Sequence, residues 1–293
     1  ITTAYQLLKD GHEVSIVERA GTVAEATSFS NAGLIAPGHA YAWASPSAPA
    51  MLLRSLWRGD QAIRFSPRLS LGQWRWARRF LAECTTARAV ANTRVKARLC
   101  RYSQHVLGDV VAETKVAYDR NGGGLVYFYR SPARFEAGLA RCGVLREAGI
   151  RIDALTADEV IARDPGLAGA RRLIAGALHA PSDESGDCRK FTQGLAAVCR
   201  AKGASLQFGR AVTRLEKDGD RLTGARTANG VVTGDAYVLA LGVSSPFLAA
   251  PLGIDLPVYP VKGYAMTVPI TDATKVARLG GVDEDNLLAY CPM

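Results

Sequence analysis

The sequence predicts an α/β fold, and two stretches carry that prediction. Near the amino terminus, a helix-like segment closed by Gly11 is followed by an apolar run from Val14 to Val17 that ends on Glu18. Such a run is typical of a buried parallel strand, and an acid at the end of such a strand can accept hydrogen bonds from ribose hydroxyls. Later in the chain, short β segments are joined by strong hairpin signals at Asp218–Gly219 and Asn229–Gly230. Glu18 is therefore a candidate ribose ligand in a dinucleotide-binding βαβ unit.

The first residues read as a helix already in progress, because Ala4, Leu7 and Leu8 share one face before Gly11. In a complete βαβ unit the glycine-rich phosphate loop lies about twenty residues before the ribose acid. Counting back from Glu18 places its last glycine just before Ile1. We therefore expect a fragment that lacks the first strand and the phosphate loop. An ordinary helix, turn and strand with a chance terminal acid is the alternative.

The segment TSFSNAGLIAPG, Thr27 to Gly38, packs small and hydroxyl residues around Asn31 and Gly33. Small residues let backbone N–H groups approach a pyrophosphate closely. The segment resembles the T-S-x-x-N-A-G stretch of the D-amino acid dehydrogenases, which are FAD enzymes of the D-amino acid oxidase-like group. The resemblance continues through HAYAWASPSAPA, DESGDCRKFTQGLA, DAYVLALG and PVYPVKGYAMTVPI, and so covers essentially the whole chain.

This resemblance implies a Rossmann-like FAD-binding domain with an inserted β-meander, joined to a substrate domain of mixed sheet and helices. We expect the FAD-binding domain over residues 1–45 and 188–258. The substrate domain is expected over residues 46–187 and 259–293, incomplete at its carboxyl terminus.

The resemblance also implies which residues contact FAD. Glu18 would hold the adenosine ribose, the segment around Asn31 would lie along the diphosphate and isoalloxazine, and the backbone at Val212 would face the adenine. Gly242 follows a strand expected at 237–241 and would allow a close approach of the cofactor. The predicted cofactor residues are Glu18, Arg19, Ser28, Asn31, Ala32, Gly33, Leu34, Val212, Ala240 and Gly242.

Two candidate catalytic residues follow from the stretch Pro257 to Ile270, which resembles a family strand that passes near the flavin ring and the substrate. Lys262 is placed to stabilise negative charge on the reduced ring, and Tyr264 is the second candidate. A surface lysine on an edge strand is the alternative for Lys262.

The activity that the resemblance implies is oxidation of a D-amino acid such as D-alanine by hydride transfer from Cα to flavin N5. The resulting imino acid hydrolyses to a 2-oxo acid and ammonia. A quinone or another respiratory carrier is the favoured electron acceptor. No side-chain base is required when the substrate amine is neutral, and among the histidines only His39, in the expected flavin loop, is of interest.

Other activities stay open at this point. The nearest is a related flavoenzyme that acts on glycine, sarcosine or proline. An NAD-linked dehydrogenase would also accept a ribose acid at Glu18, but it needs neither the meander nor the TSFSNAG segment. A third alternative is a non-catalytic binding module with a basic surface.

The net charge of +9 leaves three interpretations: a solvated face, an anionic membrane surface or nucleic acid. Trp74 and Trp76 lie beside arginines, which favours contact with a membrane surface. The helical spacing of Leu71, Trp74, Ala77 and Leu81 instead favours core packing for Trp74. No nucleic-acid motif is recognisable. We expect a cytoplasmic enzyme, peripheral on the inner face of the cell membrane, with no nucleic-acid partner.

The six cysteines are scattered without a C-x-x-C pair, which predicts free thiols in a reducing compartment. Asp183, Glu184 and Asp187 crowd one short loop. A metal site is possible with three acids, but a polar loop with Asp187 capping the helix from Cys188 is the simpler interpretation. We therefore predict no metal.

Other local signals predict ordinary structural elements. NGGGLVYFYR, residues 121–130, predicts a turn and a strand with Tyr127 and Tyr129 on one face and Phe128 on the other. Ser131 before a proline and Thr156 before Glu159 predict two helix starts, the second with a capping box.

Overall fold

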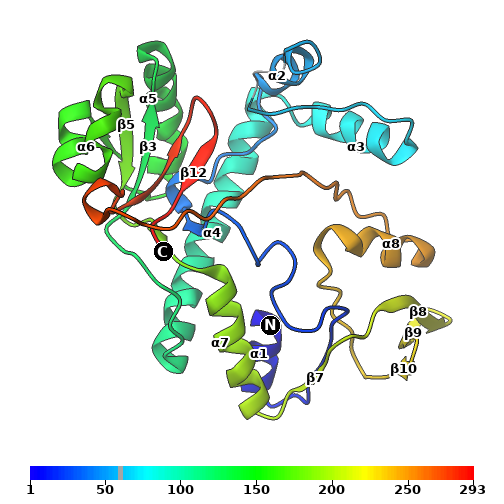
Figure 1. The fold of residues 1–293 in the computed structure, drawn as a ribbon. Coiled ribbons are helices and arrows are strands. Elements are labelled where there is room, and N and C mark those ends of the chain that lie inside the picture. The colour runs from blue at the N-terminus through cyan, green and yellow to red at the C-terminus, as the bar shows by residue number, and fades with distance from the viewer. Residues whose placement is uncertain (59–61) are drawn as a thin grey trace. The chain divides into compact units, whose positions relative to one another are not determined.

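The computed structural model describes residues 1–58 and 62–293 (Figure 1), which form two compact units. Unit 1 comprises Ile1–Ser30 and Arg189–Tyr264, and unit 2 comprises Asn31–Cys188 and Ala265–Met293. The functional domains expected from the sequence have boundaries near residues 45, 187 and 258. These domains stay a prediction, because the division into compact units does not test which part of the chain binds FAD and which binds the substrate.

The elements are labelled in Figure 1. The α-helices are α1 (Thr2–Lys9), α2 (Ala48–Arg54), α3 (Leu71–Ala82), α4 (Thr86–Thr114), α5 (Pro132–Glu147), α6 (Ala157–Arg163), α7 (Cys188–Ala201) and α8 (Ser245–Ala249). The 3₁₀ helices are η1 (Pro37–His39), η2 (Pro165–Leu173), η3 (Gly242–Ser244), η4 (Ala250–Leu252) and η5 (Ala273–Lys275). The strands are β1 (Ser15–Val17), β2 (Leu34–Ile35), β3 (Leu125–Tyr129), β4 (Asp153–Leu155), β5 (Gly176–Ala180), β6 (Glu184–Ser185), β7 (Ser205–Gln207), β8 (Val212–Asp218), β9 (Arg221–Thr227), β10 (Gly230–Val232), β11 (Gly280–Asp283) and β12 (Leu288–Tyr290).

Unit 1 contains a short parallel pair and an antiparallel meander. β1 lies parallel to β7 with Ile16 opposite Leu206, and α1 and α7 precede the two strands along the chain. The predicted start of the fold, a helix that leads into a parallel strand, is confirmed. β8, β9 and β10 form an antiparallel sheet with turns at the two predicted hairpin signals, Asp218–Gly219 and Asn229–Gly230.

Two strands expected from the sequence do not form. Residues 237–241 have no strand structure, and Val238 is 62% exposed although a buried strand was predicted. The stretch Pro257 to Ile270 also contains neither helix nor strand, and Tyr264 is 88% exposed. A strand needs a neighbour for its backbone N–H and C=O groups. Neither segment has a neighbouring strand among the described residues. The apolar sequence of each segment is therefore not sufficient for it to form a strand.

Unit 2 is built on a five-stranded sheet with the order β12-β11-β3-β5-β4, in which only β11 and β3 are parallel. Every residue of the central strand β3 is buried. Tyr127 and Tyr129 pack into a cluster with Leu145 of α5, and Phe128 packs with Val160 of α6 on the opposite face. Figure 1 shows α5 and α6 beside these strands. The predicted alternation of β3 is confirmed.

The core interpretation of the apolar stripe on α3 is wrong. Leu71 is 88% exposed and Trp74 51% exposed, while the one buried residue of α3 is the polar Gln73. Its side-chain amide bonds the main chain at Ser66 and Arg68, so α3 turns its polar side toward the loop that precedes it. Trp74 lies edge-on to Phe65 with ring centroids 6.4 Å apart. No helix in the described part of the chain is long and apolar enough to cross a membrane.

Candidate functional site

Glu18 lies at the carboxyl end of the parallel pair in unit 1, directly after β1. Its N–H donates to the Gln207 carbonyl at 2.9 Å, and its own carbonyl accepts from the Arg210 N–H at 2.9 Å. One carboxylate oxygen accepts from the Ala20 N–H at 2.8 Å, and the side chain is half-buried. Nucleotides bind outside the carboxyl ends of parallel strands, so the geometry fits a ribose ligand. Arg19 beside it is exposed.

Arg189, at the start of α7, is a candidate that the sequence did not reveal. Its guanidinium carbon lies 4.0 Å from the ring centroid of Phe29, and Nη2 donates to Glu25 at 3.0 Å. Nε is buried and has no hydrogen-bond partner within the described residues. A buried donor without an acceptor is costly, so a phosphate oxygen fits at this position next to the predicted cofactor residue Ser28. The signal was missed because a lone arginine after an acidic loop has no pattern.

The predicted cofactor residues Asn31 to Leu34 open unit 2, and backbone contacts fix them. Asn31 Oδ1 accepts from the Gly33 N–H at 2.8 Å, and the Gly33 carbonyl accepts from the Gly186 N–H at 2.8 Å. Gly33 has φ +63°, and a Cβ on it would lie 2.8 Å from the Gly186 oxygen, so only glycine fits there. Asn31 and Ala32 are exposed. Leu34 is half-buried in β2.

The remaining predicted residues are dispersed. Val212 begins β8 opposite Thr227, where it is half-buried. Ala240 and Gly242 are exposed outside any strand, since the expected strand before Gly242 does not form. Lys262 and Tyr264 do lie together, because Lys262 Nζ is 4.9 Å from the Tyr264 ring centroid. Both are exposed, and their catalytic roles stay predictions.

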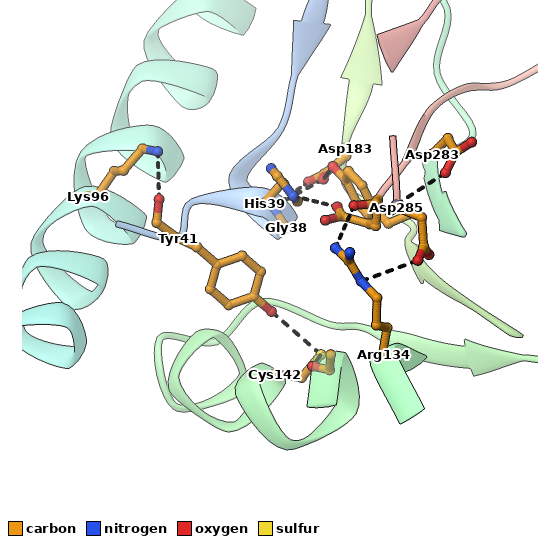
Figure 2. A network of polar contacts seen from close by, with 12 residues as sticks. Gly38, His39, Tyr41, Lys96, Arg134, Cys142, Asp183, Asp283 and Asp285 are labelled. Atoms are coloured by element: carbon orange, nitrogen blue, oxygen red, sulfur yellow. Dashed lines mark hydrogen bonds and ion pairs between the residues drawn. The ribbon is translucent and has the colours of Figure 1, made fainter. Parts of the chain in front are cut away.

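A buried polar cluster lies in unit 2, formed by residues that are far apart in the sequence (Figure 2). Gly38 donates its N–H to both carboxylate oxygens of Asp183 at 2.9 and 3.0 Å, and the Tyr127 hydroxyl donates to Asp183 Oδ2 at 2.6 Å. The His39 ring stacks on Tyr127 with centroids 4.9 Å apart, and its Nε2 lies 2.6 Å from Oε1 of Glu284. We call these five residues the Asp183 network.

The electrostatics of the Asp183 network follow from its burial. Asp183 is 1% exposed and Glu284 6% exposed. Burial raises the pKa of Asp183 to about 6, although hydrogen bonds from Tyr127 and Gly38 act in the opposite direction. Burial and the adjacent Asp183 carboxylate raise the pKa of Tyr127 well above its usual value. The network therefore holds its hydroxyl proton on Tyr127, and its Asp183 carboxyl group has a pKa raised to about 6.

A second group of charges lies next to the Asp183 network, at the end of β11. Asp283 is 1% exposed and bonds Arg130 Nε at 2.8 Å, and Arg134 donates to the Glu284 carbonyl at 2.9 Å. Burial alone would raise the pKa of Asp283, but hydrogen bonds from Arg130 and Asn286 outweigh it, and the pKa lies below its usual value. These pairs fix the end of β11 against β3 and α5.

The sequence predicted only part of these clusters. His39 was of interest as a member of the flavin loop, whereas Asp183 was interpreted as part of a polar loop. The described ranges contain no group of three His, Cys, Asp or Glu side chains arranged to hold a metal ion. A cavity of about 380 Å³ lies between α4 and the loop of Ser182, and none of the predicted site residues lines it.

The residues present fit an FAD cofactor in three respects. A carboxylate stands at the end of the parallel pair, the buried Nε of Arg189 has no hydrogen-bond partner within the described residues, and Gly33 holds a backbone conformation that only glycine fits, next to the exposed Asn31 and Ala32. Each of these features fits a different part of the cofactor. They agree with a ribose ligand, an anion ligand and a close backbone approach, respectively.

Comparisons with known proteins point to one family. Residues 1–291 match the model of the DAO family, described as FAD dependent oxidoreductase. The chain is 43% identical over 288 residues to D-amino acid dehydrogenase 2 of Mesorhizobium japonicum, covering 98% of this chain and 69% of the relative. It is also 43% identical over 289 residues to D-amino acid dehydrogenase of Cereibacter sphaeroides, covering 99% of this chain and 66% of the relative. The chain thus spans about two thirds of the length of these relatives.

Solved structures show the same fold at low sequence identity. L-proline dehydrogenase from P. horikoshii aligns with a TM-score of 0.61 at 15% identity, over 97% of this chain and 61% of that one. Glycine oxidase from Bacillus cereus aligns with a TM-score of 0.56 at 20% identity, over 85% of this chain and 54% of that one. The mixed α/β fold, the family match and the residues that fit FAD agree, and the chain belongs to the DAO family of FAD-dependent oxidoreductases.

Proposed function

We propose that the protein oxidises D-amino acids to 2-oxo acids and ammonia with FAD as its cofactor. The observation that carries this proposal is the 43% identity, over nearly the whole chain, to proteins named D-amino acid dehydrogenase. Loss of the Cα hydrogen as hydride converts the neutral amine to an iminium ion, and water hydrolyses this ion to the 2-oxo acid and ammonium. FAD supplies this redox chemistry when bound, so the chain binds and orients the reactants.

Individual residues have separate parts in this proposal. Glu18 accepts hydrogen bonds from the adenosine ribose, and Arg189 donates to a phosphate oxygen. The exposed residues Asn31 and Ala32 lie along the flat part of the cofactor in this proposal. Lys262 is proposed to stabilise negative charge on the reduced ring, with Tyr264 beside it.

The test is the visible spectrum of the full-length protein, recorded anaerobically before and after addition of D-alanine and, in a separate sample, L-alanine. We expect a flavin spectrum that only the D-isomer bleaches, because hydride transfer reduces the flavin. A flavin spectrum that neither isomer bleaches would contradict the substrate but keep the cofactor. Glycine, sarcosine and L-proline are the next substrates to add, because structural neighbours are named glycine oxidase and L-proline dehydrogenase.

We also propose that the enzyme is cytoplasmic and contacts an anionic membrane surface, where a quinone or another respiratory carrier accepts its electrons. The charge distribution supports this proposal. Between residues 43 and 102 there are 12 of the 36 Lys and Arg residues but 2 of the 27 acids, which leaves 24 cations and 25 acids elsewhere. The positive charge of the chain therefore resides in this segment, which we call the basic segment.

The basic segment also exposes large apolar side chains. All four tryptophans of the chain lie in it, and Trp43 and Trp57 are 66% and 74% exposed. The exposed residues also include Leu53, Leu56, Leu69, Leu71, Trp74, Leu81, Val95, Leu99 and Tyr102. Indole rings beside guanidinium groups suit the interface of a bilayer that contains anionic lipid.

Cosedimentation with lipid vesicles tests the membrane contact. We expect binding to vesicles with phosphatidylserine or phosphatidylglycerol and none to phosphatidylcholine vesicles, with binding lost at high salt. Replacing Arg75, Arg78 and Arg79 by Gln should weaken binding by about two orders of magnitude, since each basic residue contributes about 1 kcal/mol. The control removes the same charge elsewhere, at Arg200, Arg214 and Arg221. Equal losses in both variants would show a diffuse charge effect and contradict a specific face.

A further inference from the structure

The residues that precede His39 are attached at both ends to one short stretch of chain. At one end, the Gly33 carbonyl accepts from the Gly186 N–H, and Leu34 pairs with Ser185 across β2 and β6. At the other end, Gly38 donates to the Asp183 carboxylate. Residues 183–186 thus hold segment 31–38 from both sides, with Asn31 and Ala32 exposed.

The contact at Gly38 leaves no space for a side chain at that residue. A Cβ on Gly38 would lie 2.6 Å from Asp183 Oδ2 and would also collide with the Ala180 side chain. The peptide therefore lies directly against the carboxylate. The orientation of Asp183 then decides where the end of segment 31–38 lies, because no side chain separates the two.

Tyr127 is the side chain that orients Asp183. Its hydroxyl donates to Asp183 Oδ2 at 2.6 Å from the central strand of the sheet, where the ring is 2% exposed. The same ring stacks on His39, the residue that follows segment 31–38. Among the described residues, no Lys or Arg side chain hydrogen-bonds to Asp183, so its carboxylate depends on donors from Tyr127 and Gly38.

We propose that Tyr127 and Asp183 are positioning residues for the cofactor: they fix segment 31–38 in the conformation that contacts FAD. The inference rests on the proposed function, because the proposed function assigns segment 31–38 to the flavin. Neither side chain needs to touch the cofactor. Their effect passes through the Gly38 N–H and the ring of His39.

The experiment compares Tyr127→Phe with Tyr129→Phe in the full-length protein. Both tyrosines lie on β3, on the same face and buried, but the Tyr129 hydroxyl lies against α5 at Gly138 rather than in the Asp183 network. The two readouts are the dissociation constant of FAD, from flavin fluorescence, and the visible circular dichroism of the bound flavin. The free energy of unfolding of the apoprotein is measured in parallel.

For Tyr127→Phe we expect about tenfold weaker FAD binding, as for a lost hydrogen bond to a charged group, and an altered flavin dichroism. For Tyr129→Phe we expect wild-type affinity and dichroism, even where the apoprotein loses similar stability. Equal effects of the two variants, or none from Tyr127→Phe, would overturn the proposal. A wild-type protein that binds no FAD would overturn both the proposed function and this inference, so the two failures are distinguishable.

Asp183→Asn completes a double-mutant cycle with Tyr127→Phe. It is a second variant that tests the proposal if Tyr127→Phe itself folds poorly. Asparagine keeps the shape of the side chain and one acceptor for the Gly38 N–H. In this background we expect Tyr127→Phe to have little further effect on FAD affinity, because its partner has already changed. Additive losses from the two substitutions would contradict a shared action through segment 31–38.

Discussion

Asp183 is a residue whose protonation affects the stability of unit 2. Its pKa rises from the usual 3.8 to about 6 because the group is buried. A raised pKa means that the folded state binds the proton more tightly than the unfolded state does. The protonated Asp183 side chain therefore contributes its full stabilisation of the folded state below pH 3.8, and this contribution is lost as the pH rises through about 6. Holding segment 31–38 with an ionised carboxylate therefore costs folding free energy at neutral pH.

The corresponding prediction concerns Asp183→Asn. Between pH 4.5 and pH 7.5 the free energy of unfolding of the wild type should fall relative to the variant by about 2 kcal/mol. Urea unfolding at the two pH values measures it. Asp153→Asn is the contrast, because its hydrogen bond to Arg151 lowers the pKa of Asp153 and the pH effect has the opposite sign. A difference for Asp183→Asn that does not change with pH would contradict the raised pKa.

Glu18 gives a second prediction at this scale. Glu18→Ala in the full-length protein should weaken FAD binding by about tenfold to a hundredfold, because two hydrogen bonds from ribose hydroxyls to a carboxylate are lost. Titration of the apoprotein with FAD measures the effect. Glu13→Ala, an exposed acid just before the same strand, is the matched control. Unchanged affinity in Glu18→Ala would remove this residue from the site.

Among the elements, α6 shows how a local signal determines a helix start. Thr156 Oγ1 accepts from the Glu159 N–H at 3.3 Å, and Glu159 Oε2 accepts from the Thr156 N–H at 2.7 Å, which is the predicted capping box. Ser131 occupies the same position at α5 but makes no side-chain bond to that helix. The sequence predicted both helix starts correctly, but only Thr156 forms the capping hydrogen bonds.

This difference predicts unequal effects of alanine. Thr156→Ala should raise the rate of amide exchange in the first turn of α6 by about fivefold, equivalent to about 1 kcal/mol. Ser131→Ala should change exchange in α5 far less, because it removes no cap hydrogen bond. Hydrogen–deuterium exchange followed by mass spectrometry compares both in one experiment. Similar effects at the two helices would show that the side-chain bonds seen at α6 do not stabilise it.

Elements with local signals could be predicted, whereas those that depend on distant partners could not. The hairpin at Asp218–Gly219 and the alternation of β3 follow from residues next to one another. The strand expected at 237–241 does not form, because its backbone groups have no neighbouring strand in the part of the chain that the structure describes. The Asp183 network was missed for the same reason, since Asp183 bonds Gly38 across 145 residues and Tyr127 across 56 residues.

On the scale of the whole molecule, the sequence predicted the family and the mixed α/β fold, because several family blocks occur in the expected order. It also identified Trp74 beside arginines, although it favoured packing of that ring in the core. The exposure of α3 could not be read from its periodicity, since helical spacing shows that a face is apolar but not what covers it. In the structure the buried side of α3 is the polar one, at Gln73.

The stretch at residues 237–241, which forms no strand in the structure, has a practical consequence for handling this chain. It places Val238 and Leu241, 62% and 39% exposed, on a backbone segment that pairs with no strand within residues 1–58 and 62–293. Sequences of this kind pair readily with another copy of themselves and start aggregates. Production of these 293 residues in soluble form therefore calls for low temperature, low concentration and a solubilising fusion partner. Protein recovered from inclusion bodies would not by itself mean that the chain cannot fold.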